Sequence, residues 1–196
     1  MTDDAPRLVL DTCAGNIVIA VHASAAPTTV RYVRTLVETR CFDGATFYRS
    51  TNFGIRGRLP LIQGGPLAPL FTASSNAIPA LEMLDVVEST TSSGLAHVRG
   101  TVSLARDLVS TGHVLPELFI CLDAHPELDA GGRTEPDSLG FPAFGSVSSG
   151  LDVVASIAAM ETDGASPVER LAGEILTEPV VIRRAEFTSR PPESSI

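Results

Sequence analysis

The stretch RLVLDTCAGNIVIAV, residues 7–21, places two short apolar runs on either side of a small-residue turn. Leu8 to Leu10 forms the first run and Ile17 to Val21 the second, with Gly15 and Asn16 between them. Apolar runs joined by a turn of this composition are typical of a β-hairpin. The chain is therefore expected to begin as antiparallel sheet.

Two segments carry the periodicity of amphipathic helices. The first, SAAPTTVRYVRTLVETR at residues 24–40, has Pro27 near its start, as helix N-termini often do. The second is GLDVVASIAAM, residues 150–160. Apolar side chains recur at close to 3.6 residues in both, at Val30, Val33, Leu36 and Val37 and at Leu151, Val154, Ile157 and Ala158. These faces are expected to pack on a sheet.

Six further short runs have the composition of strands. They lie at residues 47–49, 61–63, 102–105, 118–121, 144–147 and 180–182. With the opening hairpin they make eight strands, which together with two helices and long Gly/Pro-rich connections predict a mainly β fold. The expected architecture is a closed barrel whose ends the helices cover.

The length and composition favour one domain over residues 1–196. A chain of 196 residues with 44% hydrophobic content suffices for one well-packed domain and is short for two. The expected core spans about residues 7–186, and the polar tail TSRPPESSI, residues 188–196, is expected to be loosely held. The connections at 66–99 and 123–140 are long enough to carry function.

Charge and cysteine content limit the partners and the compartment. The formal net charge of −9 disfavours nucleic acid and anionic membranes. The sequence has neither a signal-peptide pattern near its start nor an apolar run long enough for a membrane span. Cys13, Cys41 and Cys121 do not form a CxxC or zinc pattern, so reduced thiols in a soluble, cytoplasmic protein are expected.

Common catalytic motifs are missing from the chain. It contains no GxSxG, GxxxxGK[ST], GxGxxG or HExxH pattern. Each of the isolated histidines is expected at the surface or at a cap rather than on a metal: His22, His97, His113 and His125. The acidic cluster Glu82, Asp85 and Glu88 is expected to be a solvated loop face.

One pattern remains, in residues 47–65, FYRSTNFGIRGRLPLIQGG, where Arg49 ends an apolar triplet and Gln63 precedes two glycines. Together with other segments in the same order, it makes the chain resemble the cyclophilin family of peptidyl-prolyl isomerases over about residues 7–186. The LARD and FPAFG forms are similar to bacterial members. The matching segments are TCAGNIVIAVHASAAPTTVRYVRTLV, CFDGATFYRS, LIQGG, GTVSLARD, ELFICL, PELD, FPAFGSVSSGLDVVASI and PVVI.

The resemblance implies a closed eight-stranded antiparallel barrel, two capping helices and an active groove on the outer face of the barrel. It implies that Arg49 and Gln63 are catalytic. The implied substrate-binding residues are Phe47, Leu61, Leu104, Ala105, Arg106, Glu117, Phe119, Leu128 and Phe141. No cofactor and no metal are implied. The expected partners are proline-containing peptides and unfolded or nascent protein chains, bound by a monomer.

The implied reaction explains why the usual motifs are unnecessary. Rotation about an X-Pro bond breaks no covalent bond; it opposes only amide resonance. In the twisted state the prolyl nitrogen regains a lone pair, which a guanidinium can contact through a hydrogen bond. Arg49 is assigned to that role, Gln63 to holding the substrate backbone, and Phe119 to burying the pyrrolidine ring.

Several positions depart from the family pattern. Pro60 stands where the family commonly has phenylalanine, and the connection from Arg49 to Gln63 is longer, with Arg56 and Arg58 among its extra residues. Glu117 replaces a groove glutamine and is expected to pair with Arg49 or Arg106. In addition, Glu127 replaces a bulky residue that is often tryptophan, and Phe141 replaces a histidine.

These departures leave two alternatives to an active isomerase. The first is a proline-peptide-binding module that has the barrel and little or no turnover, a hypothesis motivated by Pro60, Glu117 and Glu127. The second is a hydrolase or metal enzyme, which depends only on the scattered acidic residues and histidines.

Overall fold

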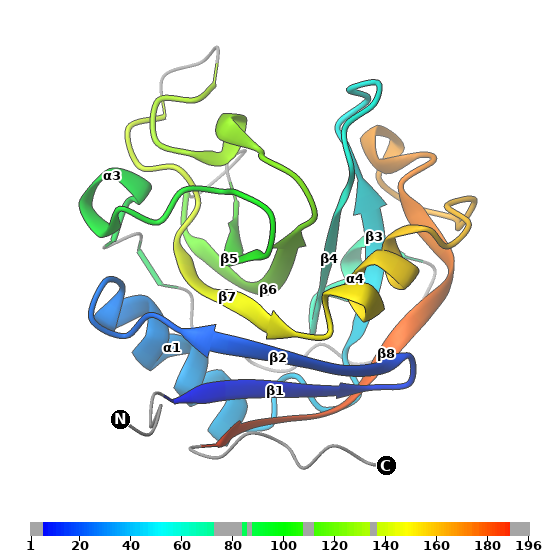
Figure 1. Cartoon of the computed structure of the whole chain (residues 1–196). Coiled ribbons are helices and arrows are strands. Elements are labelled where there is room, and N and C mark those ends of the chain that lie inside the picture. The colour runs from blue at the N-terminus through cyan, green and yellow to red at the C-terminus, as the bar shows by residue number, and fades with distance from the viewer. Residues whose placement is uncertain (1–5, 73–83, 86–87, 108–111, 134–136, 189–196) are drawn as a thin grey trace.

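Eight strands form a closed antiparallel barrel in the computed structural model, which describes residues 6–72, 84–85, 88–107, 112–133 and 137–188. The order around the barrel is β1-β2-β7-β5-β6-β4-β3-β8, and β1 closes it by pairing with both β2 and β8. The strands are β1 (Arg7–Thr12), β2 (Gly15–Val21), β3 (Thr46–Thr51), β4 (Leu61–Gly65), β5 (Thr101–Arg106), β6 (Val114–Cys121), β7 (Ala143–Ser149) and β8 (Ile175–Thr188). The predicted opening hairpin and the eight-stranded barrel are confirmed (Figure 1).

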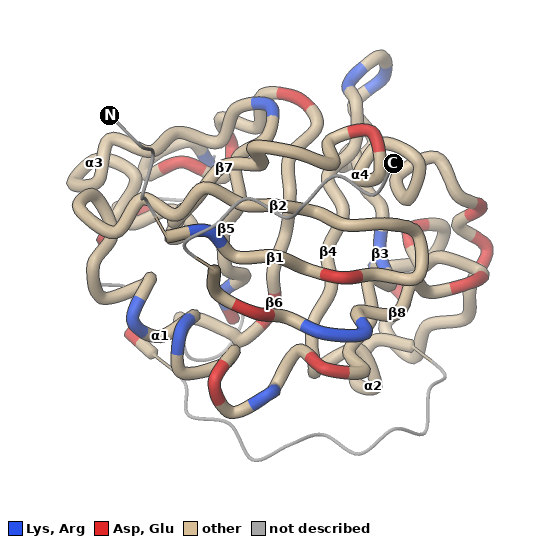
Figure 2. Tube along the Cα trace, turned by 60° about the horizontal axis from the view of Figure 1, so that its bottom comes forward, with Lys and Arg blue, Asp and Glu red and all other residues tan. Residues whose placement is uncertain are grey.

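The two predicted helices are α1 (Pro27–Glu38) and α4 (Leu151–Ala158). They lie on opposite sides of the barrel in both Figure 1 and Figure 2. Their apolar faces are directed at the sheet: Val33 of α1 and Val154 and Ile157 of α4 are fully buried. The periodicity therefore identified the correct helical faces.

Four short helical turns were not predicted: α2 (Ala68–Phe71), α3 (Thr90–Ser93), η1 (Pro126–Leu128) and η2 (Glu169–Leu171). The first three lie in the long connections at 66–99 and 123–140, and η2 lies between α4 and β8. Single turns are too short to show a hydrophobic period. No helix among the described residues is long and apolar enough to cross a membrane. The tail at 189–196 and Glu82 lie outside the described residues.

Glu88 corrects the expectation of a solvated acidic loop. Its carboxylate is buried and accepts hydrogen bonds from the backbone N–H groups of Thr28 (2.8 Å) and Thr29 (3.0 Å) and from the Thr29 hydroxyl (2.6 Å). The N-cap residue of α1, Ala26, provides no side-chain cap. Glu88 therefore caps this helix from 59 to 60 residues further along the chain.

Strand alternation decides which side chains face the barrel interior. In β6, Leu118 and Ile120 belong to the barrel core, whereas Phe119 and Cys121 belong to a second apolar cluster on the outer face. A register shift in β3 between Phe47 and Arg49 interrupts the alternation of that strand. As a result Phe47 faces the core while both Tyr48 and Arg49 line a groove on the outer face.

Candidate active site

A groove of about 710 Å³ runs over the outer face of the barrel. It is floored by strands β3 to β6, which are neighbours in the order β3-β4-β6-β5. The predicted site residues that line it are Arg49, Leu61, Gln63, Ala105, Arg106, Phe119, Leu128 and Phe141. Arg49 and Gln63 are direct partners in the pairing of β3 with β4. These eight residues, of eleven predicted, are thus brought together on one surface.

Three of the predicted substrate-binding residues do not line this groove. Phe47, Leu104 and Glu117 are each 0% exposed. Phe47 and Leu104 point into the barrel core, on the opposite side from their outward-facing neighbours Tyr48 and Ala105. Glu117 lies beneath the groove floor, so none of these three side chains is accessible from the groove, contrary to the expected position at its surface.

One end of the groove is an apolar pocket. Phe119, Leu128 and Phe141 form it, with the two phenyl rings edge to face at 5.6 Å between centroids and 85° between planes. The Arg133 guanidinium covers the Phe141 ring at 4.9 Å from its centroid. An apolar concave surface of this kind accepts a small hydrophobic ring.

Arg49 stands beside this pocket and is held from two sides. Its Nε and Nη2 groups donate to Glu174 Oε2 at 2.8 and 2.6 Å, and its Nη1 group donates to Gln63 Oε1 at 2.8 Å. A guanidinium has five N–H groups, so two remain after these three bonds. Glu174, at the end of the loop before β8, was missed by the sequence analysis, and a separation of 125 residues from Arg49 left no local signal.

Gln63 connects Arg49 to a buried phenol. Its Nε2 group donates to the Tyr48 hydroxyl at 3.0 Å, while its Oε1 accepts from Arg49. The amide therefore has its orientation fixed by two partners of opposite hydrogen-bonding character. One N–H and one lone pair of the amide remain for a peptide backbone.

Glu117 lies behind Tyr48 and does not pair with Arg49 or Arg106, which corrects the predicted ion pair. Its Oε1 accepts from the Leu67 N–H at 2.6 Å, and its Oε2 has no hydrogen-bond partner among the described residues. Burial raises the pKa of Glu117 to about 8, although the Leu67 N–H and the nearby Tyr48 hydroxyl favour the ionised form. The protonated, uncharged form of the carboxyl is thus favoured over the ionised form at neutral pH.

Arg106 is neutralised at the groove edge by Asp137. Its Nη1 group lies 3.0 Å from both Asp137 carboxylate oxygens and donates to the Gly140 carbonyl at 2.8 Å. Burial raises the pKa of Asp137, but the hydrogen bonds from Arg106 and from the backbone outweigh it and hold that pKa below its ordinary value. Arg106 therefore fastens the 137–140 segment to β5.

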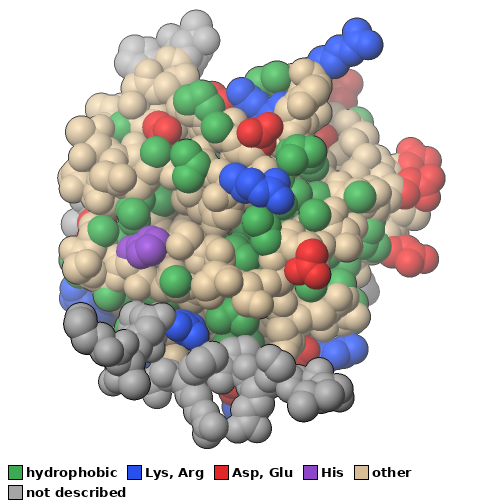
Figure 3. Space-filling model, in the orientation of Figure 1, with side chains coloured by type: hydrophobic (Ala, Val, Ile, Leu, Met, Phe, Trp, Pro, Cys, Tyr) green, Lys and Arg blue, Asp and Glu red, His purple; other side chains and the backbone are tan. Residues whose placement is uncertain are grey.

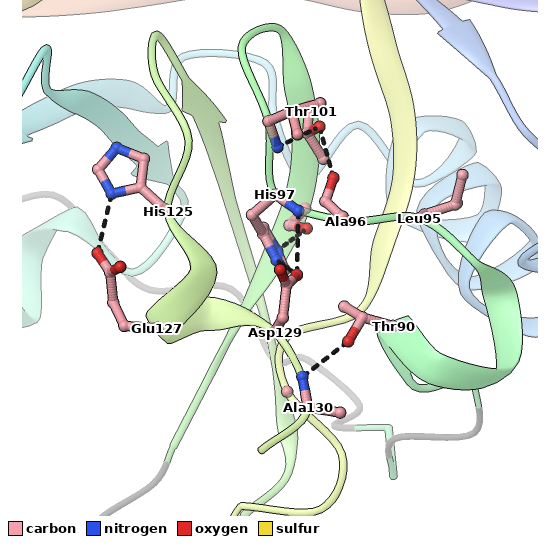
Figure 4. A network of polar contacts seen from close by, with 12 residues as sticks. Thr90, Leu95, Ala96, His97, Thr101, His125, Glu127, Asp129 and Ala130 are labelled. Atoms are coloured by element: carbon pink, nitrogen blue, oxygen red, sulfur yellow. Dashed lines mark hydrogen bonds and ion pairs between the residues drawn. The ribbon is translucent and has the colours of Figure 1, made fainter. Parts of the chain in front are cut away.

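A buried histidine, His97, packs against the apolar pocket and is bonded to Asp129, as Figure 4 shows for the latter contact. His97 Nδ1 lies 2.7 Å from Asp129 Oδ1 and its Nε2 lies 2.8 Å from Ser103 Oγ, and its ring stacks on Phe119 at 5.5 Å. Burial lowers the pKa of His97, so the ring is neutral. Because a carboxylate only accepts, Nδ1 carries the proton and Nε2 accepts from Ser103.

These contacts bear on the predicted position of the histidines and on the hydrolase alternative. His97 and His125 are buried, so the prediction of a surface position is wrong for both, although His125 does occupy the N-cap position of η1, without a side-chain capping bond. Ser103, His97 and Asp129 are connected in the order of a hydrolase triad, but Ser103 is 0% exposed beneath the groove. The arrangement serves as a support for Phe119. Among the described residues, no three His, Cys, Asp or Glu side chains could hold a metal ion.

The connection between β3 and β4 contributes an aromatic residue to the groove that the sequence analysis did not identify. Phe53 lines the groove, whereas Pro60, at the position where an aromatic residue was expected, does not. The connection projects from the barrel in Figure 1 (cyan, top). Figure 3 shows a basic side chain at the top of this face and acidic side chains along its right-hand edge.

Comparison with known proteins agrees with this geometry. The model of the family "Cyclophilin type peptidyl-prolyl cis-trans isomerase/CLD" matches residues 7–186. Peptidyl-prolyl cis-trans isomerase A of Dickeya dadantii (strain 3937) is 26% identical over 184 residues, which cover 94% of this chain and 85% of the relative. Peptidyl-prolyl cis-trans isomerase cyp18 of Streptomyces antibioticus is 30% identical over 180 residues, covering 91% and 96%.

A solved structure shares the fold at low sequence identity. The Cryptosporidium parvum cyclophilin type peptidyl-prolyl cis-trans isomerase, crystallised in the presence of the dipeptide Ala-Pro, has a TM-score of 0.68 and 16% identity. The match covers 94% of this chain and 99% of that chain. With the barrel, the outer-face groove and the family match over residues 7–186 in agreement, the chain belongs to the cyclophilin-type peptidyl-prolyl cis-trans isomerase family.

Proposed function

We propose that the groove accelerates rotation about X-Pro bonds in peptides and unfolded protein chains, with Arg49 as the catalytic group. The observation that carries this proposal is the position of Arg49: its guanidinium is fixed by Glu174 and Gln63 beside an apolar pocket, with two N–H groups left over. The pocket of Phe119, Leu128 and Phe141 holds the pyrrolidine ring. The carbonyl side of the bond then turns while the ring stays fixed.

The energetics of this reaction suit such a site. The barrier to rotation is about 18–20 kcal/mol, because amide resonance is lost as the bond twists and the prolyl nitrogen becomes pyramidal. A guanidinium N–H next to that nitrogen donates a hydrogen bond that the planar amide cannot accept, so it favours the transition state over the ground state. A 10⁵-fold acceleration requires about 7 kcal/mol, and positioned electrostatic groups supply several kcal/mol each.

The proposal is tested by a protease-coupled assay on an Ala-Pro peptide. We expect the purified protein at micromolar concentration to accelerate the cis to trans change well above the uncatalysed rate. A rate equal to the uncatalysed one would refute turnover.

The second candidate is a proline-peptide-binding module. It is favoured by the fact that Glu174 and Gln63 already occupy three of the five Arg49 N–H groups. A module of this kind would shift backbone amide signals on addition of an Ala-Pro peptide, while exchange between its cis and trans signals stayed as slow as in the free peptide. An isomerase would shift the same signals and also produce exchange cross-peaks.

Monomeric state, cytoplasmic location and nascent-chain clients stay predictions from the sequence. The cysteines among the described residues are free thiols, which is compatible with a reducing compartment. Size-exclusion chromatography with light scattering tests the monomer, and cell fractionation tests the location.

A further inference from the structure

The connection between β3 and β4 is braced against the rest of the molecule. Its Arg58 guanidinium forms an ion pair with Glu127, on the neighbouring turn η1, and the Leu59 N–H donates to Asp123 Oδ2 at 3.2 Å. Within the connection, the Asn52 side chain donates to the carbonyl groups of Ile55 and Arg58. Figure 2 shows this hairpin projecting at the top, with basic residues near its tip. The connection is thus fixed both by bonds within it and by bonds to η1 and Asp123, which gives it a defined position relative to the groove.

Phe53 is placed by this hairpin at the mouth of the groove. Its ring is edge-on to His125, with 5.8 Å between centroids and 83° between planes, and the Arg49 guanidinium lies 5.9 Å from its centroid. The side chain is nevertheless 39% exposed. It therefore presents apolar surface to a ligand that lies on Arg49.

The backbone of Phe53 adopts a left-handed conformation, with φ of 54°. A bulky side chain is uncommon in this region and is found there mainly where its surroundings enforce it. The bond that spans Phe53 runs from the Gly54 N–H to Asn52 Oδ1 at 3.0 Å. The Thr51 hydroxyl accepts from the Phe53 N–H at 2.9 Å and donates to Glu174 Oε1 at 2.6 Å. The same hydroxyl thus connects Phe53 to the carboxylate that holds Arg49.

We infer that Phe53 is a specificity-determining residue: it forms an aromatic wall beside Arg49 that selects substrates with an apolar or aromatic residue next to the proline. This inference rests on the proposed function of the groove. A proline ring in the pocket of Phe119 and Phe141, with its nitrogen at Arg49, brings the adjacent residue of the peptide against Phe53. An apolar side chain there covers the exposed face of Phe53, which glycine cannot do.

The ion pair of Arg58 with Glu127 holds the hairpin that carries Phe53, and we call this ion pair the latch. Glu127 Oε1 also lies 3.1 Å from His125 Nδ1, so one carboxylate connects the hairpin to the ring that Phe53 packs on. Loss of the latch frees the hairpin edge while leaving Phe53 in the sequence. The wall and its support are therefore separable by substitution.

Two series of peptides, Xaa-Pro and Pro-Xaa with Gly, Ala, Leu or Phe as Xaa, test the inference. Both kcat/KM and the dissociation constant from amide shifts are measured for wild type, Phe53→Ala and Ile55→Ala. Ile55 is the matched control because it is exposed on the same hairpin and does not line the groove. Binding constants keep the test valid if turnover is absent, so failure of the inference and failure of the isomerase proposal are distinguished.

We expect wild type to favour Leu or Phe over Gly by about tenfold in one of the two series, as an apolar contact of this size provides. Phe53→Ala should reduce that preference to about twofold or less, and Ile55→Ala should leave it unchanged. Equal preferences in wild type and Phe53→Ala at both positions would overturn the inference.

The latch has its own matched pair of variants. Arg58→Ala should lower the Leu and Phe preference severalfold, whereas Arg56→Ala, an exposed arginine at the same tip, should not. Identical selectivity in the two arginine variants would refute the latch, and the result for Phe53→Ala would still decide the wall.

Discussion

Glu174 holds Arg49 through a single carboxylate oxygen: Oε2 accepts from both Nε and Nη2 of the guanidinium, at 2.8 and 2.6 Å. The other oxygen, Oε1, accepts from the Thr51 hydroxyl at 2.6 Å. The carboxylate is thus fixed at both ends, and it fixes the plane of the guanidinium. Glu174 is a positioning residue, because it acts on the reaction through Arg49.

Replacement of Glu174 should separate positioning from charge. Glu174→Ala removes both hydrogen bonds to Arg49, and we expect kcat/KM to fall about tenfold because a catalytic donor loses its orientation. Glu174→Gln keeps an amide oxygen that accepts from Arg49, and it should retain most of the activity. The measurement is the coupled assay on an Ala-Pro peptide, with folding of each variant checked by thermal unfolding.

A higher rate in Glu174→Ala than in wild type would contradict positioning. It would mean that the carboxylate competes with substrate for the guanidinium. Similar losses in the Ala and Gln variants would also contradict it, since geometry alone should be rescued by the amide.

Glu117→Gln should change stability with pH and leave turnover within about twofold of wild type. The folded pKa of Glu117 is about 8, above its ordinary value of 4.5, so the folded state binds the proton more tightly than the unfolded state. Wild-type stability contributed by this group is therefore full below pH 4.5 and is lost as pH rises toward and through 8. Glutamine has no proton to lose there.

Denaturant unfolding between pH 5 and 9 measures this effect. The free energy of unfolding of Glu117→Gln relative to wild type should increase with pH across that range. For Glu178→Gln, a change at an exposed position of β8, the free energy of unfolding should vary with pH as it does in wild type. Parallel curves for Glu117→Gln as well would show that Glu117 ionises normally in the folded protein.

Glu88→Ala should weaken the start of α1 without affecting the groove. The variant loses three hydrogen bonds at the helix N-terminus, and we expect a loss of about 1–3 kcal/mol in the free energy of unfolding at pH 7. Burial raises the pKa of Glu88, but the hydrogen bonds from Thr29 and Thr28 outweigh it and lower the pKa below 4.5. The stabilisation is therefore present above pH 4.5 and is lost as pH falls through the folded pKa.

Unfolding of wild type and Glu88→Ala at pH 7 and pH 3 tests this prediction. The difference between the two proteins should be large at pH 7 and smaller at pH 3. A difference that is the same at both values would indicate that the carboxylate charge contributes nothing to the cap.

Local patterns were sufficient to predict the strands and the two long helices, and the family resemblance supplied Arg49 and Gln63, which the structure pairs across β3 and β4. Alternation within strands also had the information to exclude Leu104: it is adjacent to Ala105, and neighbours in a strand face opposite sides. The same rule would have failed for Phe47, because the register shift after this residue breaks the alternation with Arg49. The length of β8 was underestimated, with 14 residues observed and three predicted, because exposed polar residues separate its apolar ones.

Contacts between distant segments could not be predicted. Glu174 reaches Arg49 across 125 residues, Glu88 reaches α1 across about 60, and Arg58 reaches Glu127 across 69. Each acidic residue is hydrophilic and far from its partner in sequence, which indicates a solvated surface when nothing else is known. Only the fold shows that each of these carboxylates lies next to hydrogen-bond donors from a distant segment.

The central claim is that Arg49 donates to the prolyl nitrogen in the twisted state, and the most direct measurement is kcat/KM for Arg49→Ala on an Ala-Pro peptide, with peptide affinity measured in parallel. Loss of one transition-state donor should lower kcat/KM about 10²–10³-fold, as removal of an oxyanion-hole donor does, while the apolar pocket still binds peptide. An Arg49→Ala protein that binds the peptide and turns it over within about threefold of wild type would contradict the mechanism, even with the barrel and the family assignment unchanged.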